Sequence, residues 1–156
     1  MGQGRKVNFQ GVYNNSIDPK GRASIPAQFR EKLSASFAAD NLVVTQKDGG
    51  LAAYPESEWE KNQAKVEAME PGPLKEALYL ALISPAKPCS FDKQGRIQLS
   101  QAHRDYAGLD SEIREIVVVG VDRRIMIWSK AKHAEMQAQA ETRIVDDPQV
   151  LANLGF

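Results

Sequence analysis

The chain has 156 residues, with 20 basic and 20 acidic side chains and a formal net charge of zero. This balance excludes a strongly basic nucleic-acid binder and restricts any anion-binding surface to a local patch. The single cysteine, Cys89, excludes an internal disulfide framework and suits a reducing compartment. The N-terminus does not have the pattern of a signal peptide and the apolar runs are too short to span a bilayer, so we expect a soluble, cytoplasmic protein of one or two small domains.

The first part of the chain is predicted to form strands and tight turns around one short helix. Asp18–Gly21 favours a tight turn, because Asp18 can accept hydrogen bonds from the following backbone, Pro19 presets φ and Gly21 tolerates positive φ. An Asp-Gly pair at Asp48 indicates a hairpin. The expected elements are strands over 9–17, 22–25, 41–46 and 51–54, and a helix over 27–33.

Two helices are expected next. Ser57 has an acidic residue three positions later, the spacing of a capping box, which predicts a helix from Ser57 to Met69. Pro73 then begins a second helix, closed by Pro85, whose apolar side chains over 74–82 follow helical spacing. After it we expect strands over 86–91, 96–99, 116–121 and 125–128, a short helix ending near Gly108, and a helix over 130–143 with Ser129 as its N-cap.

The stretch around the first turn occurs twice. Gly21 and Gly95 are 74 positions apart (95 − 21 = 74), and at this offset the motif Asp-x-x-Gly-Arg recurs. The match continues in register to Tyr54 and Trp128. The recurring pairs are Ser16/Ser90, Asp18/Asp92, Gly21/Gly95, Arg22/Arg96, Arg30/Arg104 and Asp48/Asp122. We interpret this as a tandem duplication of one supersecondary unit, with a first repeat over 9–55 and a second over 85–129.

The sequence shows no metal-ligand spacing, and nothing in it supports a Cys–His nucleophile pair, although the sequence alone leaves that pair open. Cys89, His103 and His133 lie far apart without zinc-ligand spacing, and we expect a buried thiol and two surface histidines. The glycines form no nucleotide-binding fingerprint. Trp59 and Trp128 are expected to pack rather than to stack on bases. We therefore predict no catalytic residues, no metal, no cofactor and no enzymatic activity.

The duplicated turns carry cations. Arg22 and Arg96 each directly follow a turn, and Lys20 and Lys93 lie within the turns. A planar guanidinium can bind phosphate oxygens, or guanine O6 and N7, with two hydrogen bonds. Alternatively the turns are only hairpin corners in which each arginine pairs with its aspartate, as is common on protein surfaces. The pattern alone does not separate these interpretations.

The same residues resemble the two motifs of the MraZ family. The matching segments are the stretch 16–30, Asp92–Ile97 followed by Arg104–Leu109, Tyr54-Pro55 with Glu58-Trp59, and Ile127-Trp128-Ser129. The resemblance covers the chain from about Phe9 to Glu141, with its motifs in the expected order.

This resemblance implies an α+β fold. Two tandem AbrB-like swapped-hairpin β-α-β units would form a pseudo-twofold small β-barrel, with helices inserted between the units and at the C-terminus. The implied segments are a first repeat over 9–55, a helical insert over 56–84, a second repeat over 85–129, and a C-terminal helix and tail over 130–156. We expect burial of the apolar stripe of the insert by assembly.

The resemblance also implies a function. It predicts a sequence-specific DNA-binding transcriptional regulator of the bacterial division and cell-wall gene cluster, located in the cytoplasm with the nucleoid. The implied partners are double-stranded DNA with promoter direct repeats and further copies of the chain in a closed ring, with no membrane. The alternative is a structural ring or protein-interaction module without specific DNA binding.

The turn pattern and the resemblance together assign site residues. The expected DNA-binding residues are Arg22, Arg96, Lys20, Lys93, Arg30 and Arg104, and the expected turn-forming residues are Asp18, Gly21, Asp92 and Gly95. Whether Arg30 and Arg104 touch DNA or pack is left open. Ser100 replaces an expected proline and Gln94 replaces a lysine, which predicts a looser helix start and a weaker phosphate contact in the second repeat.

Overall fold

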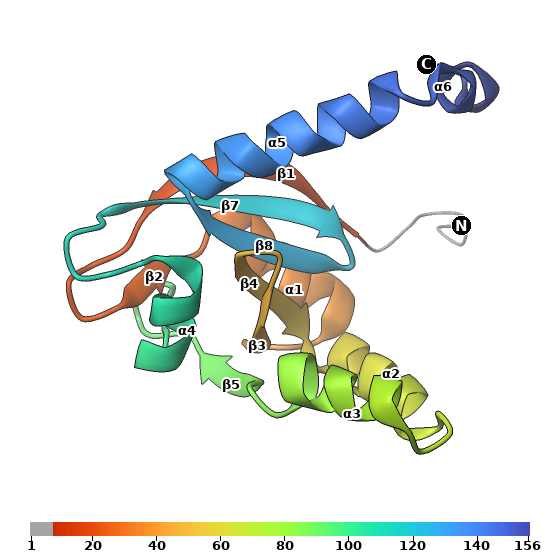
Figure 1. The fold of residues 1–156 in the computed structure, drawn as a ribbon. Helices are drawn as coiled ribbons and strands as arrows, with labels where there is room; N and C mark the ends of the chain where they lie inside the picture. The colour runs from red at the N-terminus through yellow and green to blue at the C-terminus, as the bar shows by residue number, and fades with distance from the viewer. Residues whose placement is uncertain (1–7) are drawn as a thin grey trace.

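The computed structural model describes residues 8–156 and has an α+β architecture, shown in Figure 1. Its strands are β1 (Phe9–Ser16), β2 (Arg22–Ser24), β3 (Asn41–Lys47), β4 (Gly50–Pro55), β5 (Lys87–Ser90), β6 (Arg96–Gln98), β7 (Glu115–Asp122) and β8 (Arg124–Ser129). Its helices are α1 (Ala27–Phe37), α2 (Glu56–Glu67), α3 (Pro73–Leu78), α4 (Gln101–Ala107), α5 (Lys130–Val145) and α6 (Pro148–Leu154), with the π-helical turn η1 (Tyr79–Ile83) after α3. All the predicted strands are present.

The two repeats interleave in one antiparallel sheet of order β1-β7-β8-β4-β3-β5. The first strand of each repeat pairs with the third strand of the other: β1 pairs with β7, and β5 pairs with β3. In the middle, β4 of the first repeat pairs with β8 of the second. The order therefore reads the same when the repeats are exchanged, as a pseudo-twofold relation requires.

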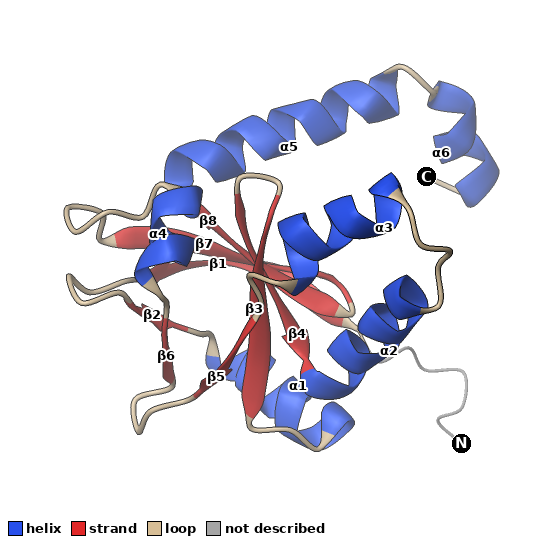
Figure 2. Cartoon of the chain, turned by 60° about the horizontal axis from the view of Figure 1, so that its bottom comes forward, coloured by secondary structure: helices blue, strands red, loops and turns tan. Residues whose placement is uncertain are grey.

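A second, two-stranded ribbon joins β2 to β6, with Ala23 opposite Ile97. This pairing brings together the turns that precede the two strands. The six-stranded sheet is open, with β1 and β5 at its edges, so its hydrogen bonds do not close into the expected small barrel. The observed fold is α+β with two repeats and an antiparallel sheet (Figure 2).

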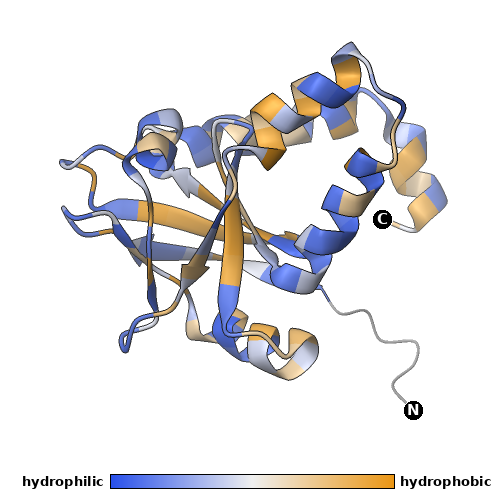
Figure 3. Ribbon diagram, turned by 90° about the horizontal axis from the view of Figure 1, so that it is seen from below, coloured by the Kyte–Doolittle hydropathy of each residue, from blue (hydrophilic) through white to orange (hydrophobic). Residues whose placement is uncertain are grey.

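Both repeats contribute to one apolar core. Ala23 and Ile97, which oppose each other in the ribbon, are fully buried. Ile25 and Leu99, at the same position of each repeat, are also buried, as are Phe29 and Leu33 on α1. Figure 3 shows the hydrophobic colour running along strands of the sheet, while the loops at one end are largely hydrophilic. The core thus fixes the ribbon and leaves its turns at the surface.

The helix starts differ from two of the predictions. The helix α2 begins at Glu56 after Pro55, and no side-chain cap bond forms, so the predicted Ser57 cap is wrong. Pro55 has φ −55°, which already suits a helix entry, and acidic residues in the first turn favour the positive end of the helix. The predicted looser start of α4 is also wrong, because the Ser100 side chain accepts the backbone N–H of His103. The predicted Ser129 cap of α5 is confirmed.

The insert helices pack beside β3 and β4. The rings of Tyr54 and Trp59 lie 5.5 Å apart, which holds α2 on the sheet. The predicted second helix is α only over α3 and continues as η1, where the Thr45 hydroxyl donates to the carbonyl of Leu82 at 2.6 Å. In Figure 1 α5 extends past the sheet and carries α6 at its far end.

Candidate functional site

The first turn, Asp18–Arg22, is organised by the Asp18 side chain. Its Oδ1 accepts the backbone N–H groups of Lys20 at 3.1 Å and of Arg22 at 2.8 Å. The backbone N–H of Gly21 donates to the Asp18 carbonyl at 2.9 Å. Gly21 has φ +85°, a conformation that glycine adopts without steric cost. The turn is therefore rigid, and Arg22 at its end is the first residue of β2.

The second turn, Asp92–Arg96, has the same hydrogen bonds. Asp92 Oδ1 accepts the backbone N–H groups of Gln94 and of Arg96, both at 2.9 Å. Gly95 donates to the Asp92 carbonyl at 3.0 Å and has φ +76°. The duplication thus extends from sequence to hydrogen-bond geometry.

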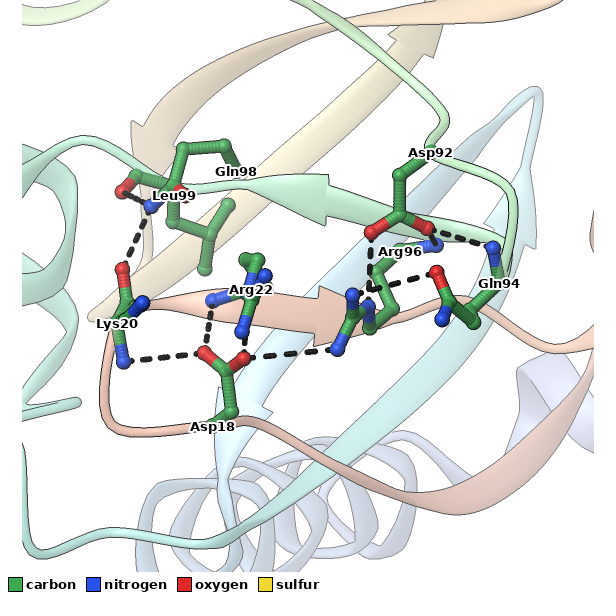
Figure 4. Close-up of polar contacts among 8 residues, drawn as sticks. All are labelled: Asp18, Lys20, Arg22, Asp92, Gln94, Arg96, Gln98 and Leu99. Carbon is green, nitrogen blue, oxygen red and sulfur yellow. Dashed lines mark hydrogen bonds and ion pairs between the residues drawn. The ribbon is translucent and has the colours of Figure 1, made fainter.

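The two turns are tied across the pseudo-twofold. The Gly21 carbonyl accepts the backbone N–H of Leu99 at 2.9 Å, and the Gly95 carbonyl accepts that of Ile25 at 3.1 Å. Each turn is therefore bonded to the strand end of the other repeat. As Figure 4 shows, Arg22 and Arg96 both approach the Asp18 carboxylate.

Both turn arginines pair with the aspartate of their own turn. Arg22 Nε lies 2.5 Å from Asp18 Oδ2, and Arg96 Nε lies 2.8 Å from Asp92 Oδ2. Arg96 Nη1 also lies 3.6 Å from Asp18 Oδ2 in the other turn. The expected pairing of arginine with aspartate is present. It does not remove the arginines from solvent, because their side chains are 37% and 25% exposed.

Each aspartate is held in its charged form. The pKa of the Asp18 carboxyl is lowered chiefly by the hydrogen bond from the Arg22 backbone, with the Arg22 side chain adding to the effect. The pKa of Asp92 is lowered in the same way by Arg96. Lys20 and Lys93 are exposed on the two turns. The site is a paired set of cations on rigid turns, an arrangement able to bind an anion.

Arg30 and Arg104 lie beneath the turns, each against the glycine of the opposite repeat. A Cβ on Gly21 would overlap the Arg104 side chain, and one on Gly95 would overlap the Arg30 side chain. Arg30 Nε donates to the Ile25 carbonyl at 3.1 Å. Both side chains are half-buried and contact the turns from behind. The structure therefore brings all six predicted cations to one region, in two layers.

The cysteine and histidines differ in part from expectation. Cys89 is half-buried, and burial raises the pKa of its thiol to about 11. His103 is only 1% exposed, so its predicted surface position is wrong. Its Nε2 lies 2.8 Å from the Pro85 carbonyl, and burial lowers its pKa. His103 occupies a core position of α4, because the second repeat uses a histidine where the first has Phe29 (103 − 29 = 74).

Sequence reasoning missed the part played by Gln98. Its side-chain Nε2 donates to the Lys20 carbonyl at 2.7 Å and links β6 to the first turn. The sequence did show that Gln98 stands where the first repeat has Ser24, but this difference has meaning only once β2 and β6 are known to pair.

Comparison with known proteins finds relatives across both repeats. A family model with the description "MraZ protein, putative antitoxin-like" matches residues 9–76 and 82–150. A protein of Syntrophotalea carbinolica named "Transcriptional regulator MraZ" is 59% identical over 150 residues, which cover 96% of this chain and 100% of the relative. Proteins of the same name from Desulfitobacterium hafniense and Natranaerobius thermophilus are 39% and 37% identical, covering 95% and 86% of this chain and 99% and 90% of the relatives.

Proposed function

The chain belongs to the MraZ family of transcriptional regulators, and from this we propose that it binds duplex DNA sequence-specifically through its paired Asp-x-x-Gly-Arg turns. Arg22 and Arg96 would contact phosphates or guanine edges, with Lys20 and Lys93 adding charge. We propose that Arg30 and Arg104 support the turns from behind rather than reach DNA.

The observation that carries this proposal is the pairing of the two turns by the ribbon. The guanidinium groups of Arg22 and Arg96 extend from the adjacent strands β2 and β6. Each is oriented by a hydrogen bond to an aspartate that also fixes the turn backbone. Because the groups are held before binding, less side-chain freedom is lost on contact. A surface arginine on a mobile loop would lack this advantage.

The weak DNA binding expected of a single protomer supports the further proposal of an oligomer. The chain is net neutral and offers few cations, so one protomer neutralises few phosphates and should bind weakly. A closed ring that matches repeated promoter elements would raise avidity by roughly 10²–10⁴. Leu74 and Leu80 of the insert are 65% and 67% exposed, which favours their burial between protomers.

We propose further that residues 9–55 and 85–129 form AbrB-like swapped-hairpin units for DNA, while 56–84 and 130–156 serve assembly. The interleaved strand order supports this division. The resemblance also leads us to propose promoter direct repeats of the division and cell-wall gene cluster as the target, in the cytoplasm with the nucleoid. No helix within residues 8–156 has the length and apolar character needed to cross a membrane.

The test is a fluorescence titration of the full chain with a labelled duplex from the region upstream of its own gene, at two salt concentrations. We expect wild type to bind with an affinity that falls steeply as salt rises, and the double variant R22A/R96A to lose binding while its oligomer size stays unchanged. Footprinting of the same duplex then locates the bound elements.

The competing function is a structural ring or protein-interaction module, which the exposed Leu74 and Leu80 would also suit. It predicts no salt-dependent binding of the duplex by wild type, and a protein partner in pull-down experiments. Unaltered DNA binding by R22A/R96A would overturn the assignment of the turns.

A further inference from the structure

We propose that the two turns divide the work: the first turn makes the larger share of the DNA contact, and the second turn mainly holds the first in place. This inference rests on the proposed function of the site. Three differences between the repeats lie at the ribbon of β2 and β6 and support it.

The first difference is the number of groups that hold each arginine. The Arg96 guanidinium donates hydrogen bonds to Asp92 Oδ2 at 2.8 Å and to Gln94 Oε1 at 3.3 Å, and it forms a longer ion pair with Asp18 Oδ2 at 3.6 Å. Arg22 is held by Asp18 alone, and no reciprocal ion pair from Arg22 to Asp92 occurs within residues 8–156. The Arg22 side chain is accordingly more exposed, at 37% against 25%.

The second difference lies at the third position of the turns. The first turn has Lys20, whose exposed side chain takes part in no ion pair with another described residue. The second has Gln94, whose oxygen accepts a hydrogen bond from Arg96. At this position the first repeat offers a cation to the outside, whereas the second repeat holds its own arginine. The exposed lysine of the second turn, Lys93, stands one position earlier, where the first turn has Pro19.

The third difference is a link that runs in one direction. Gln98 Nε2 donates to the Lys20 carbonyl at 2.7 Å and to the Leu99 carbonyl at 3.1 Å. The matching residue of the first repeat is Ser24, whose side chain is too short to reach the opposite turn in this way. Figure 4 shows Gln98 beside Lys20 and Arg96 beside Asp18, both reaching from the second repeat to the first.

These contacts have a clear consequence for DNA binding. Arg22 contacts Asp18 through Nε, so its Nη groups can meet a phosphate or a base while the arginine stays held. Arg96 must first give up the contacts of Nη1 with Asp18 and of Nη2 with Gln94. Releasing Arg96 would also remove a positive partner of Asp18, the side chain that fixes the first turn. Arg96 and Gln98 are therefore positioning residues for Lys20 and Arg22.

The experiment measures binding of the labelled upstream duplex by the full chain over a series of KCl concentrations, as fluorescence anisotropy. Here K is the observed association constant for the duplex. The slope of log K against log[KCl] reports how many phosphates the protein neutralises, whereas the loss of a positioning contact lowers K and leaves the slope unchanged. We expect R22A and K20A each to reduce the slope by about 1 per bound protomer. Q98S, which restores the residue of the first repeat without changing charge, should lower K roughly twofold to tenfold at unchanged slope.

Comparing R22A with R96A, and K20A with K93A, shows whether the two turns contribute unequally or equally to DNA binding. R96A should change the slope by less than half as much as R22A, and K93A by less than half as much as K20A. Equal slope changes within each pair, or no effect of Q98S on K, would overturn the division of work while leaving DNA binding intact. Absence of salt-dependent binding by wild type would instead remove the proposed function itself, and this inference with it.

Discussion

The two repeats share a turn but differ in the strand that leads to it. β1 has eight residues, and all of them pair with β7. β5 has four residues, which pair with β3. At the offset of 74 positions, the start of β1 corresponds to the end of η1 and the loop after it (9 + 74 = 83). The turn geometry is thus independent of strand length. In the second repeat, the positions that match the first half of β1 hold the last residue of η1 and the loop that follows it.

The cores behind the turns differ in the same way. Phe29 packs edge-on against Phe9 at 5.6 Å and Tyr13 at 5.1 Å, between ring centroids. Both partners lie on the long β1. Its counterpart His103 has no such strand to pack on and contacts the carbonyl of Pro85, where the helical insert ends. An aromatic cluster thus stabilises the first repeat, and in the second a hydrogen bond connects α4 to the loop after η1.

The largest expected effect is the loss of stability when the aromatic cluster of the first repeat is disrupted. F29A should lower the free energy of unfolding by about 3–5 kcal/mol, because it leaves a cavity among the buried rings. H103A removes a smaller side chain and one hydrogen bond, so we expect about 1–3 kcal/mol. Urea unfolding at fixed protein concentration measures both. Equal losses would show that the two cores are equivalent after all.

A second difference lies where the helix that follows each repeat meets the hairpin of the other repeat. On α2 the Glu58 carboxylate, 10% exposed, pairs with Arg123 at 2.8 Å, and Arg123 also lies over the Phe37 ring. The hydrogen bonds of Arg123 lower the pKa of Glu58. At the matching position α5 carries Lys132 (58 + 74 = 132), which pairs with Glu135 of the same helix. Among the described residues, α2 forms an ion pair with the hairpin opposite it, whereas Lys132 of α5 pairs within its own helix.

Replacing Glu58 and Lys132 in turn tests whether the two ion pairs contribute differently to the free energy of unfolding. E58Q should cost about 1–3 kcal/mol, because the nearly buried Glu58 loses the charge that pairs with Arg123, whose side chain is 39% exposed. K132Q should cost less than about 1 kcal/mol, because its pair is exposed. Both are read from urea unfolding at neutral pH. Since the pKa of Glu58 is lowered in the fold, its stabilising effect is present above the ordinary carboxyl pKa and is lost as pH falls through the folded value. A cost for K132Q as large as that for E58Q would contradict the asymmetry.

Much of the fold could be predicted from local signals. Strand boundaries followed from alternation and from turn residues such as Asp48 and Gly49, both of which have positive φ in the hairpin. The repeat offset predicted that Asp18 and Asp92 would occupy equivalent positions. What local signals could not show was the pairing of β2 with β6, because a strand of three residues does not specify its partner.

The same limit applies to the site. The sequence identified the six cations, but their two layers depend on α1 and α4 crossing behind the opposite turns, where Arg30 and Arg104 meet glycines. The Ser57 cap failed for a different reason. Pro55, the last residue of β4, directly precedes α2, so the helix begins at Glu56 and the capping-box spacing falls inside it.

The smallest expected effect is a pH dependence that separates His103 from Phe29. Burial lowers the pKa of His103, the nearby positive Lys87 lowers it further, and the Pro85 carbonyl partly opposes both. The fold therefore holds His103 neutral, while the unfolded chain takes up a proton below about pH 6.5. The free energy of unfolding should fall as pH drops from 7 to 5, with a contribution from this one site no steeper than about 1.4 kcal/mol per pH unit.

The variant H103F, which copies the residue of the first repeat, should remove this contribution, and H133Q serves as the histidine control. H103F also loses the bond to Pro85, so its stability at pH 7 is compared separately from its pH dependence. Asp18, Asp92 and Glu58 all have lowered pKa values and lose their contributions only at more acidic pH. A fall in stability between pH 7 and 5 that persists in H103F and vanishes in H133Q would place the titrating imidazole on α5 instead.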